Sequence, residues 1–242
     1  MSAGAVFARD WLHFRSVMGR IGFIRFFAVY CVLLGVFVPT RFDDPRAAAV
    51  VFALIPMYLA GPMAVDAIAG ERDRKTLEAL LHTPLSPRDL TLGKLLFPVA
   101  VAMALSTAAV ASNFLYSLAT SRPTAGPADL GAALAMGVPL SLLFSALGLH
   151  ISLGARSSRS AQQWYSISLL AFTIGLPLGL RSLLPRVDAG TAAALGRLFE
   201  GGVLSGGTAL LFAALLLTAV LLAYLAFRRF RRLWTMNSGP QS

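Results

Sequence analysis

The sequence predicts an all-α integral membrane protein. It would have six transmembrane helices, an N-terminal amphipathic helix at the membrane interface, and a short cytosolic helix between the second and third spans. Hydrophobic residues make up 57% of the 242 residues, which is more apolar surface than a soluble domain of this length can bury. The apolar stretches are continuous and do not alternate as the strands of a membrane β-barrel would. We therefore expect a single transmembrane domain over residues 1–242.

Residues 1–20 are expected to form an amphipathic helix that lies in the inner leaflet. Large apolar side chains recur there at helical spacing: Phe7, Trp11, Phe14 and Met18. Arginines occupy other parts of the helical wheel, so the helix has an apolar side and a charged side. A bend near Gly19 to Gly22 would lead this helix into the first span.

Six apolar stretches are close to the roughly 20 residues needed to cross the ~30 Å hydrocarbon core of a bilayer. The predicted spans are residues 21–38, 47–68, 95–118, 130–154, 164–181 and 207–227. The fifth has the weakest pattern, because Gly175, Pro177 and Gly179 interrupt its second half. Residues 182–206 form a long outer segment, in which a short interfacial or re-entrant helix is expected.

The basic residues orient these spans. With both termini in the cytosol, 15 of the 21 Lys and Arg residues fall in cytosolic segments. The positive-inside rule therefore predicts a multi-pass protein with cytosolic termini, and it places residues 69–94 in the cytosol. The net charge of +10 is explained by these topology signals, so no nucleic-acid partner is expected, and membrane lipid is the expected surrounding.

Residues 69–94 form the cytosolic hook, the stretch of the chain that is richest in charge. Residues 71–83 are predicted to form one short helix, in which Leu77, Leu80 and Leu81 share a face. Glu71 and Lys75 would pair four residues apart on the other side of this helix.

Two prolines set the far end of the hook. Pro84 ends the short helix, because a proline pushes the preceding residue out of the helical region. Ser86 then suits the N-cap of the next helix, with Pro87 and Asp89 in its first turn. The hook is therefore a stiff element with a leucine ridge flanked by charge. Docking into a groove of another protein and resting on lipid headgroups both fit this pattern.

The hook carries a series of short motifs in a fixed order. They are Gly70-Glu71-Arg72, Thr76-Leu77-Glu78, Leu80-Leu81, Thr83-Pro84, Ser86 and Gly93-Lys94. In order and spacing, residues 69–96 resemble the first cytosolic loop of ABC transporter permeases of the type-2 export family. The six-span layout and the N-terminal helix resemble the same family. One departure is Lys75, where many members of the family have Gly.

This resemblance implies that the chain is the membrane-spanning permease subunit of an ATP-driven exporter in a bacterial plasma (inner) membrane. The short helix of the hook would be a coupling helix, seated in a groove of a separate ABC ATP-binding subunit. The implied interface residues are Glu71, Arg74, Thr76, Leu77, Leu80, Leu81, Thr83, Pro84 and Arg88. A second permease copy, identical or similar, would complete a dimer.

Two further groups of residues lie within the spans. The fourth span has a stripe of small residues, for which helix packing is favoured over a pathway-lining surface: Gly137, Ser141, Ser145, Gly148 and Ser152. The third span has polar residues, for which interhelical hydrogen bonding is favoured over contact with a transported substrate: Ser106, Asn113, Tyr116 and Ser117.

We expect no enzyme activity in this chain itself. It has no G-x-x-x-x-G-K-[ST] phosphate loop, so ATP and Mg would be bound by the partner subunit. An embedded active site or metal site would need a Ser/His dyad, an aspartate pair or a carboxylate–histidine cluster, and the spans have no second carboxylate to pair with Asp66 and no histidine pair, so neither a catalytic nor a metal site is expected. The alternatives are a non-transporting membrane anchor for an ATPase, or a six-span channel or carrier that works without an ATPase.

Overall fold

The computed structural model describes residues 3–42, 45–81, 86–121, 125–175, 178 and 206–237, and all regular elements of these residues are helices. The α-helices are α1 (Ala3–Val32), α2 (Pro45–Asp73), α3 (Leu77–Leu81), α4 (Pro87–Thr120), α5 (Pro127–Gly154), α6 (Ser158–Leu170) and α9 (Gly206–Asn237). The short elements are the π-helices η1 (Leu33–Phe37) and η3 (Ala171–Gly175) and the 3₁₀-helix η2 (Pro39–Arg41). The predicted all-α class is confirmed for these residues.

Within the described residues, five helical stretches are long and apolar enough to cross a membrane. They are Ile24–Arg41, Ala48–Asp73, Pro87–Thr120, Pro127–Gly154 and Gly207–Thr235, and they overlap five of the predicted spans. The other predicted span, residues 164–181, begins in α6 and η3, but most of its residues after Gly175 lie outside the described part of the chain. The outer segment, residues 182–206, also lies outside it except for Gly206. Six spans therefore stay a prediction.

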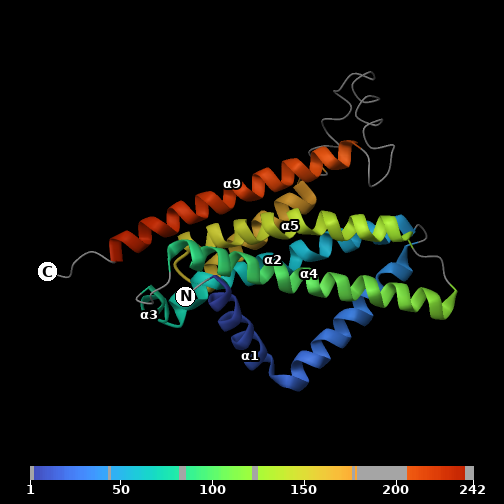
Figure 1. Ribbon diagram of the computed structural model, residues 1–242, viewed down its shortest axis with the longest axis horizontal. Helices are drawn as coiled ribbons and strands as arrows, with labels where there is room; N and C mark the ends of the chain where they lie inside the picture. Colours follow the sequence, from blue (N-terminus) through green and yellow to red (C-terminus); the bar gives the residue numbers. More distant parts are fainter. Residues whose placement is uncertain are drawn as a thin grey trace, which may run out of the picture.

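α2 and α5 form the centre of the bundle, and they pack against each other more extensively than any other described pair. α4 packs on both of them, α1 lies against α4, and α9 lies along α5 (Figure 1). The N-terminus, α3 and the C-terminal end of α9 lie at one end of the long axis, which we name the α3 end. The C-terminal end of α4 and the start of α5 lie at the opposite end (Figure 1).

α1 is bent into a V (Figure 1), and the bend lies at Gly19. The φ of Gly19 is 63° and its ψ is 165°, a conformation that side chains strongly disfavour. Nothing lies within 4 Å of the place where a Cβ would stand, so the glycine is needed for its backbone and not for space. The bend that was expected between Gly19 and Gly22 thus lies at Gly19.

The first half of α1 uses its apolar side to pack on α4. The rings of Phe7 and Phe14 contact the edge of Phe97, with centroids 5.5 and 6.2 Å apart. Trp11 is 38% exposed, and the side chain of Met18 lies outside the described residues. Part of the predicted lipid-facing side is therefore covered by the protein, and the interfacial location of this helix stays a prediction.

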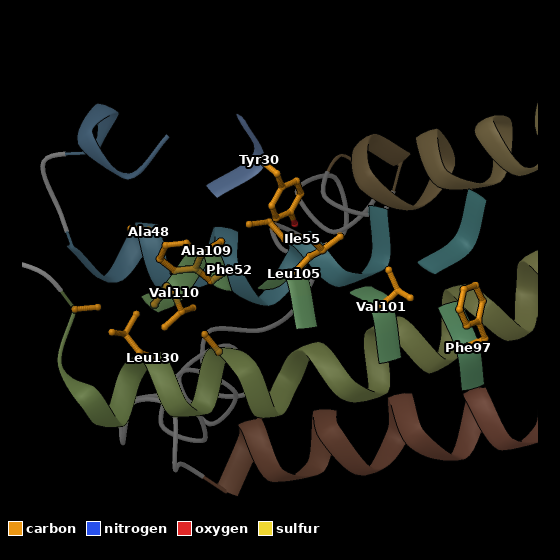
Figure 2. Packing of buried hydrophobic residues seen from close by; sticks show 13 residues of the cluster. Tyr30, Ala48, Phe52, Ile55, Phe97, Val101, Leu105, Ala109, Val110 and Leu130 are labelled. Carbon is orange, nitrogen blue, oxygen red and sulfur yellow. The ribbon is translucent and has the colours of Figure 1, made fainter. Parts of the chain in front are cut away.

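The largest buried cluster lies where α1, α2, α4 and α5 meet (Figure 2). Phe52 and Ala109 are fully buried there, and Tyr30 joins them from the second half of α1. η1 approaches α4 so closely that a Cβ on Gly35 would stand 2.6 Å from the carbonyl oxygen of Ala109. Small residues let backbones meet in this way, which is how helices associate in lipid.

α6 is held against α2 by a buried tyrosine. The hydroxyl of Tyr165 donates a hydrogen bond to the carbonyl oxygen of Met57 at 3.2 Å. Its ring lies on Gly61, where any side chain would collide with the hydroxyl group, and it meets Phe144 edge-on at 6.4 Å. This anchor fixes the start of the predicted fifth span on the centre of the bundle.

Candidate functional site

The first part of the hook is not one continuous helix, as the sequence predicts, but is broken between Asp73 and Leu77. α2 continues to Asp73, and the separate helix α3 begins at Leu77. The expected single helix over residues 71–83 is therefore wrong.

A Schellman motif, a standard helix ending, causes this break. The N–H of Thr76 donates to the carbonyl oxygen of Glu71 at 2.9 Å, and the N–H of Lys75 donates to that of Arg72 at 3.0 Å. Lys75 takes the left-handed conformation that the motif needs, with a φ of 57°. Because Lys75 has left the helix, the predicted pair between Glu71 and Lys75 is also wrong.

The structure also explains why a glycine suits position 75. A left-handed residue with a side chain costs about 1 kcal/mol, whereas glycine adopts this conformation freely. The departure of Lys75 from the family pattern therefore falls on the one described non-glycine residue of the hook that has a positive φ.

Leu80 is not part of an exposed ridge. It is 3% exposed and belongs to a buried cluster at the α3 end, together with Val6, Ile68, Leu90, Leu95, Leu149 and Phe230. Leu77 packs against the same cluster and is partly buried. Leu77 and Leu80 thus fasten α3 to its own subunit, so Leu80 is not available as the exposed anchor that the sequence predicts.

The other predicted interface residues differ in their exposure. Arg74, Thr76 and Arg88 are exposed, as are Lys75, Glu78 and Ala79 beside them. The side chain of Leu81 lies outside the described residues, as do Thr83 and Pro84.

Glu71 is bound inside the subunit. Its carboxylate lies 3.2 Å from the ammonium of Lys94 on α4 and 3.3 Å from the guanidinium of Arg9 on α1. Lys94 also lies 3.2 Å from the carboxylate of Asp10, and the side chains of Lys94, Glu71 and Asp10 are 5%, 13% and 14% exposed. The hydroxyl of Thr76 donates to the carboxylate of Glu71. Charged groups with this little exposure are stable only when paired, so this cluster locks α2, α4 and α1 together.

A second polar link ties the hook to the connection between α5 and α6. The carboxylate of Asp66 lies 3.3 Å from the guanidinium of Arg74 and accepts a hydrogen bond from the hydroxyl of Ser158 at 2.9 Å. Asp73 accepts from the backbone N–H of Ser158 at 2.8 Å. Arg72 donates to the carbonyl oxygen of Ala155. These bonds tie the end of α2 to the start of α6 and to the connection that precedes it.

Most of these partners could not be named from the sequence, because they lie 23 to 92 positions apart along the chain. The available signal was the excess of charge at the ends of helices in an otherwise apolar chain. Asp10 was visible as an acidic residue within the N-terminal helix, but nothing in its spacing pointed to Lys94.

A pocket of about 610 Å³ opens beside this cluster. This volume is large enough for a small molecule. One wall is polar and includes Glu71 and Lys94, and the other is apolar and includes Phe14 and Met63. The pocket lies between the first half of α1 and the ends of α2 and α4. None of the predicted pathway residues of the third span lines it.

In that span, Ser106 has a structural role. It is fully buried, and its hydroxyl donates to the carbonyl oxygen of Phe52 at 3.1 Å. Pro56 has no N–H to donate to this carbonyl four residues earlier in α2, so Ser106 replaces the missing hydrogen bond. Asn113 and Ser117 are 7% and 9% exposed, and Tyr116 is partly buried.

The small residues of the fourth span lie at helix contacts. A Cβ on Gly148 would stand 2.7 Å from the carbonyl oxygen of Gly61, and one on Gly137 would stand 2.9 Å from the ring of Pro56. Ser145 donates to the carbonyl oxygen of Leu95 at 2.9 Å. Further along the stripe, the Ser152 hydroxyl accepts from the N–H of Ala69 at 2.8 Å, and Ser141 is fully buried. No group of three or more potential metal ligands occurs among the described residues.

Comparison with known proteins agrees with the motif pattern of the hook. The family model described as "ABC-2 family transporter protein" matches residues 36–232. A similar curated protein is the ABC transporter permease protein NatB of Bacillus subtilis (strain 168), which is 33% identical over 140 residues. The match covers 52% of this chain and 36% of that relative, so it spans only about a third of the length of the relative.

Proposed function

The chain belongs to the ABC-2 family of transporter proteins, and from this premise we propose that it is the permease subunit of an ATP-driven exporter. In this proposal a separate ABC ATP-binding subunit hydrolyses ATP and docks on the hook. A second permease copy, identical or similar, completes the translocation pathway. The complex would lie in a bacterial plasma membrane with the α3 end in the cytosol, and ATP and Mg would be held by the ATP-binding subunit.

The observation that carries the proposal is the stiffness of the hook. α3 joins two helices of 29 and 34 residues, and the pair of Glu71 and Lys94 ties those helices together directly at their base. Leu80 seats α3 itself in the core. A displacement of α3 would therefore tilt α2 and α4 as rigid bodies instead of bending a loop, which is how packed helices transmit a switch.

This arrangement divides the residues of the hook into two sets. The inner set, which includes Glu71, Leu77 and Leu80, would transmit the force. The outer set would contact the partner, and it consists of the exposed side chains Arg74, Lys75, Thr76, Glu78, Ala79 and Arg88. Exposed charges of both signs suit the steering and register of a polar interface.

The direct test places a charge on the outer set and leaves the inner set intact. Ala79→Asp puts a carboxylate on the exposed side of α3, and Ala128→Asp makes the same change on an exposed residue at the opposite end of the bundle. Each variant is coexpressed with the ABC ATP-binding subunit that copurifies with the wild-type permease. Ala79→Asp should abolish copurification of that subunit and remove the permease-dependent part of its ATP hydrolysis, whereas Ala128→Asp should change neither.

The outcome separates the alternatives. If both variants copurify with the subunit and support hydrolysis like the wild type, docking on α3 is wrong. If docking holds but the reconstituted complex moves no candidate cargo in vesicles, the chain is an ATPase anchor and not an exporter subunit.

A further inference from the structure

Another pocket, with a volume of about 440 Å³, lies between α5, α6 and α9. It is separate from the hook cluster and shares no lining residue with the pocket beside Glu71. α6 and α9 each pack on α5, but they share hardly any contact with each other. The pocket is therefore a groove with α5 as its floor.

The charge in this groove is unbalanced. Arg156 and Arg229 line it, and none of its described lining residues is acidic. In the part of the chain that the structure describes, neither arginine takes part in a salt bridge. By contrast, Arg9 and Lys94 in the hook each have a carboxylate within 3.3 Å. Two unpaired guanidinium groups with a serine hydroxyl beside them, that of Ser160, are the groups that proteins use to bind phosphate.

One of these arginines, Arg229, lies close to the backbone at the end of α5. A Cβ on Gly154 would stand 2.8 Å from an Nη atom of Arg229, so the missing side chain of this glycine makes room for the guanidinium. Arg156 follows two residues later in the connection to α6. This connection is bonded to the end of α2 through Ser158 and Asp73, which places the basic part of the groove at the α3 end.

The groove extends from this basic part into the apolar part of the bundle. Ser160, Trp164 and Ser168 line it at intervals of four residues, so they share one face of α6 over about 12 Å. Ile151 of α5 adds an apolar side chain to the floor of the groove. Trp164 is 62% exposed, and tryptophan prefers the depth of the membrane interface.

We propose that this groove binds the headgroup of an anionic phospholipid from the leaflet at the α3 end. The phosphate lies between Arg156 and Arg229, and an acyl chain lies along Trp164. Basic pockets between membrane helices on the cytosolic side bind anionic headgroups in this way. The site differs from the proposed docking surface in position and in chemistry, because its ligand comes from the bilayer and not from a protein.

The test uses the full chain purified in detergent and native mass spectrometry with added phosphatidylglycerol or phosphatidylcholine. The wild type should retain phosphatidylglycerol in preference to phosphatidylcholine. Arg156→Gln combined with Arg229→Gln should weaken phosphatidylglycerol binding about tenfold or more. The matched control, Arg159→Gln with Arg228→Gln, removes the same charge from exposed residues that do not line the groove, and it should stay within about twofold of the wild type.

Three results would overturn the proposal: equal loss in both double variants, equal retention of the two lipids, or binding of glycerol 3-phosphate without binding of phosphatidylglycerol. Arg156→Lys with Arg229→Lys keeps the positive charge of the groove. This double variant should retain most of the phosphatidylglycerol binding, which shows that the Gln variant loses binding because it loses charge. The measurement needs no ATP-binding subunit, so its failure would leave the proposed function untouched.

Discussion

The ammonium of Lys94 lies 3.2 Å from the carboxylate of Glu71, and the two side chains are 5% and 13% exposed. Lys94 lies in the first third of α4 and Glu71 near the end of α2, so this one pair closes the base of the hook. Asp10 and Arg9 extend it to α1. The residues that make the family motif recognisable are therefore used, in this structure, to hold the hook together.

Breaking this pair should destabilise the protein. Lys94→Met removes the cation shared by two carboxylates and should cost about 3 kcal/mol, because buried charges are left without a partner. Combining it with Glu71→Gln should cost less than the two single changes added together, with a coupling of about 1–2 kcal/mol. Thermal unfolding of the four proteins in detergent measures this cycle. Strict additivity would show that the two residues do not interact.

Replacing the left-handed residue of the hook should stabilise it. Lys75→Gly removes the strain of a positive φ and should gain about 0.5–1 kcal/mol. Lys75→Val should have the opposite effect, because a β-branched residue tolerates this conformation poorly. Apparent melting temperatures of the two variants check the prediction. Shifts of both variants in the same direction from the wild type would contradict it.

The close contact of α2 and α5 should tolerate no added methyl group. In Gly148→Ala the new Cβ would stand 2.7 Å from a backbone oxygen of Gly61, so the helices must separate at a cost of about 1–3 kcal/mol. Gly131→Ala is the control on the same helix, since nothing lies within 4 Å of its Cβ position. It should be neutral or slightly stabilising. Thermal unfolding of both variants decides the matter, and equal effects would argue against close packing at Gly148.

Ser106 should matter because of Pro56. Ser106→Ala leaves the buried carbonyl of Phe52 without the hydroxyl group that donates to it, at a cost of about 1–3 kcal/mol. Pro56→Ala restores a helical N–H to the same carbonyl, so Ser106→Ala should cost less when it is made in that background. A double-mutant cycle by thermal unfolding measures this difference. A cost that is the same in both backgrounds would mean that Ser106 acts in another way.

Local signals in the sequence identified most of what local physics determines. The continuous apolar runs gave the helical membrane class, and Ser86 caps α4 by accepting from the N–H of Asp89 at 3.1 Å, as its position before Pro87 suggested. Gly19 gave the bend in α1. Each of these features depends on residues that are neighbours in the chain.

The features that were missed depend on residues far apart in the chain. The amphipathic pattern of α3 correctly placed Leu80 on the apolar face of this helix. Such a pattern does not show whether the apolar face packs on its own subunit or on a partner. Helical spacing suggested that Glu71 would pair with Lys75, whereas tertiary contact brings it Lys94 and Arg9. The hydrogen bond of Ser106 is set by a proline in another helix, which spacing within the third span cannot reveal.

Cross-linking at α3 tests the central claim, that the outer side of the hook faces an ATP-binding subunit. The chain has a single cysteine, Cys31, so Cys31→Ala gives a background without thiols, into which Ala79→Cys or Ala128→Cys is introduced. Membranes that contain the assembled complex are treated with a short amine-to-thiol cross-linker. The account predicts a covalent product between the permease and the ATP-binding subunit for Ala79→Cys and none for Ala128→Cys. A product from Ala128→Cys alone would contradict it.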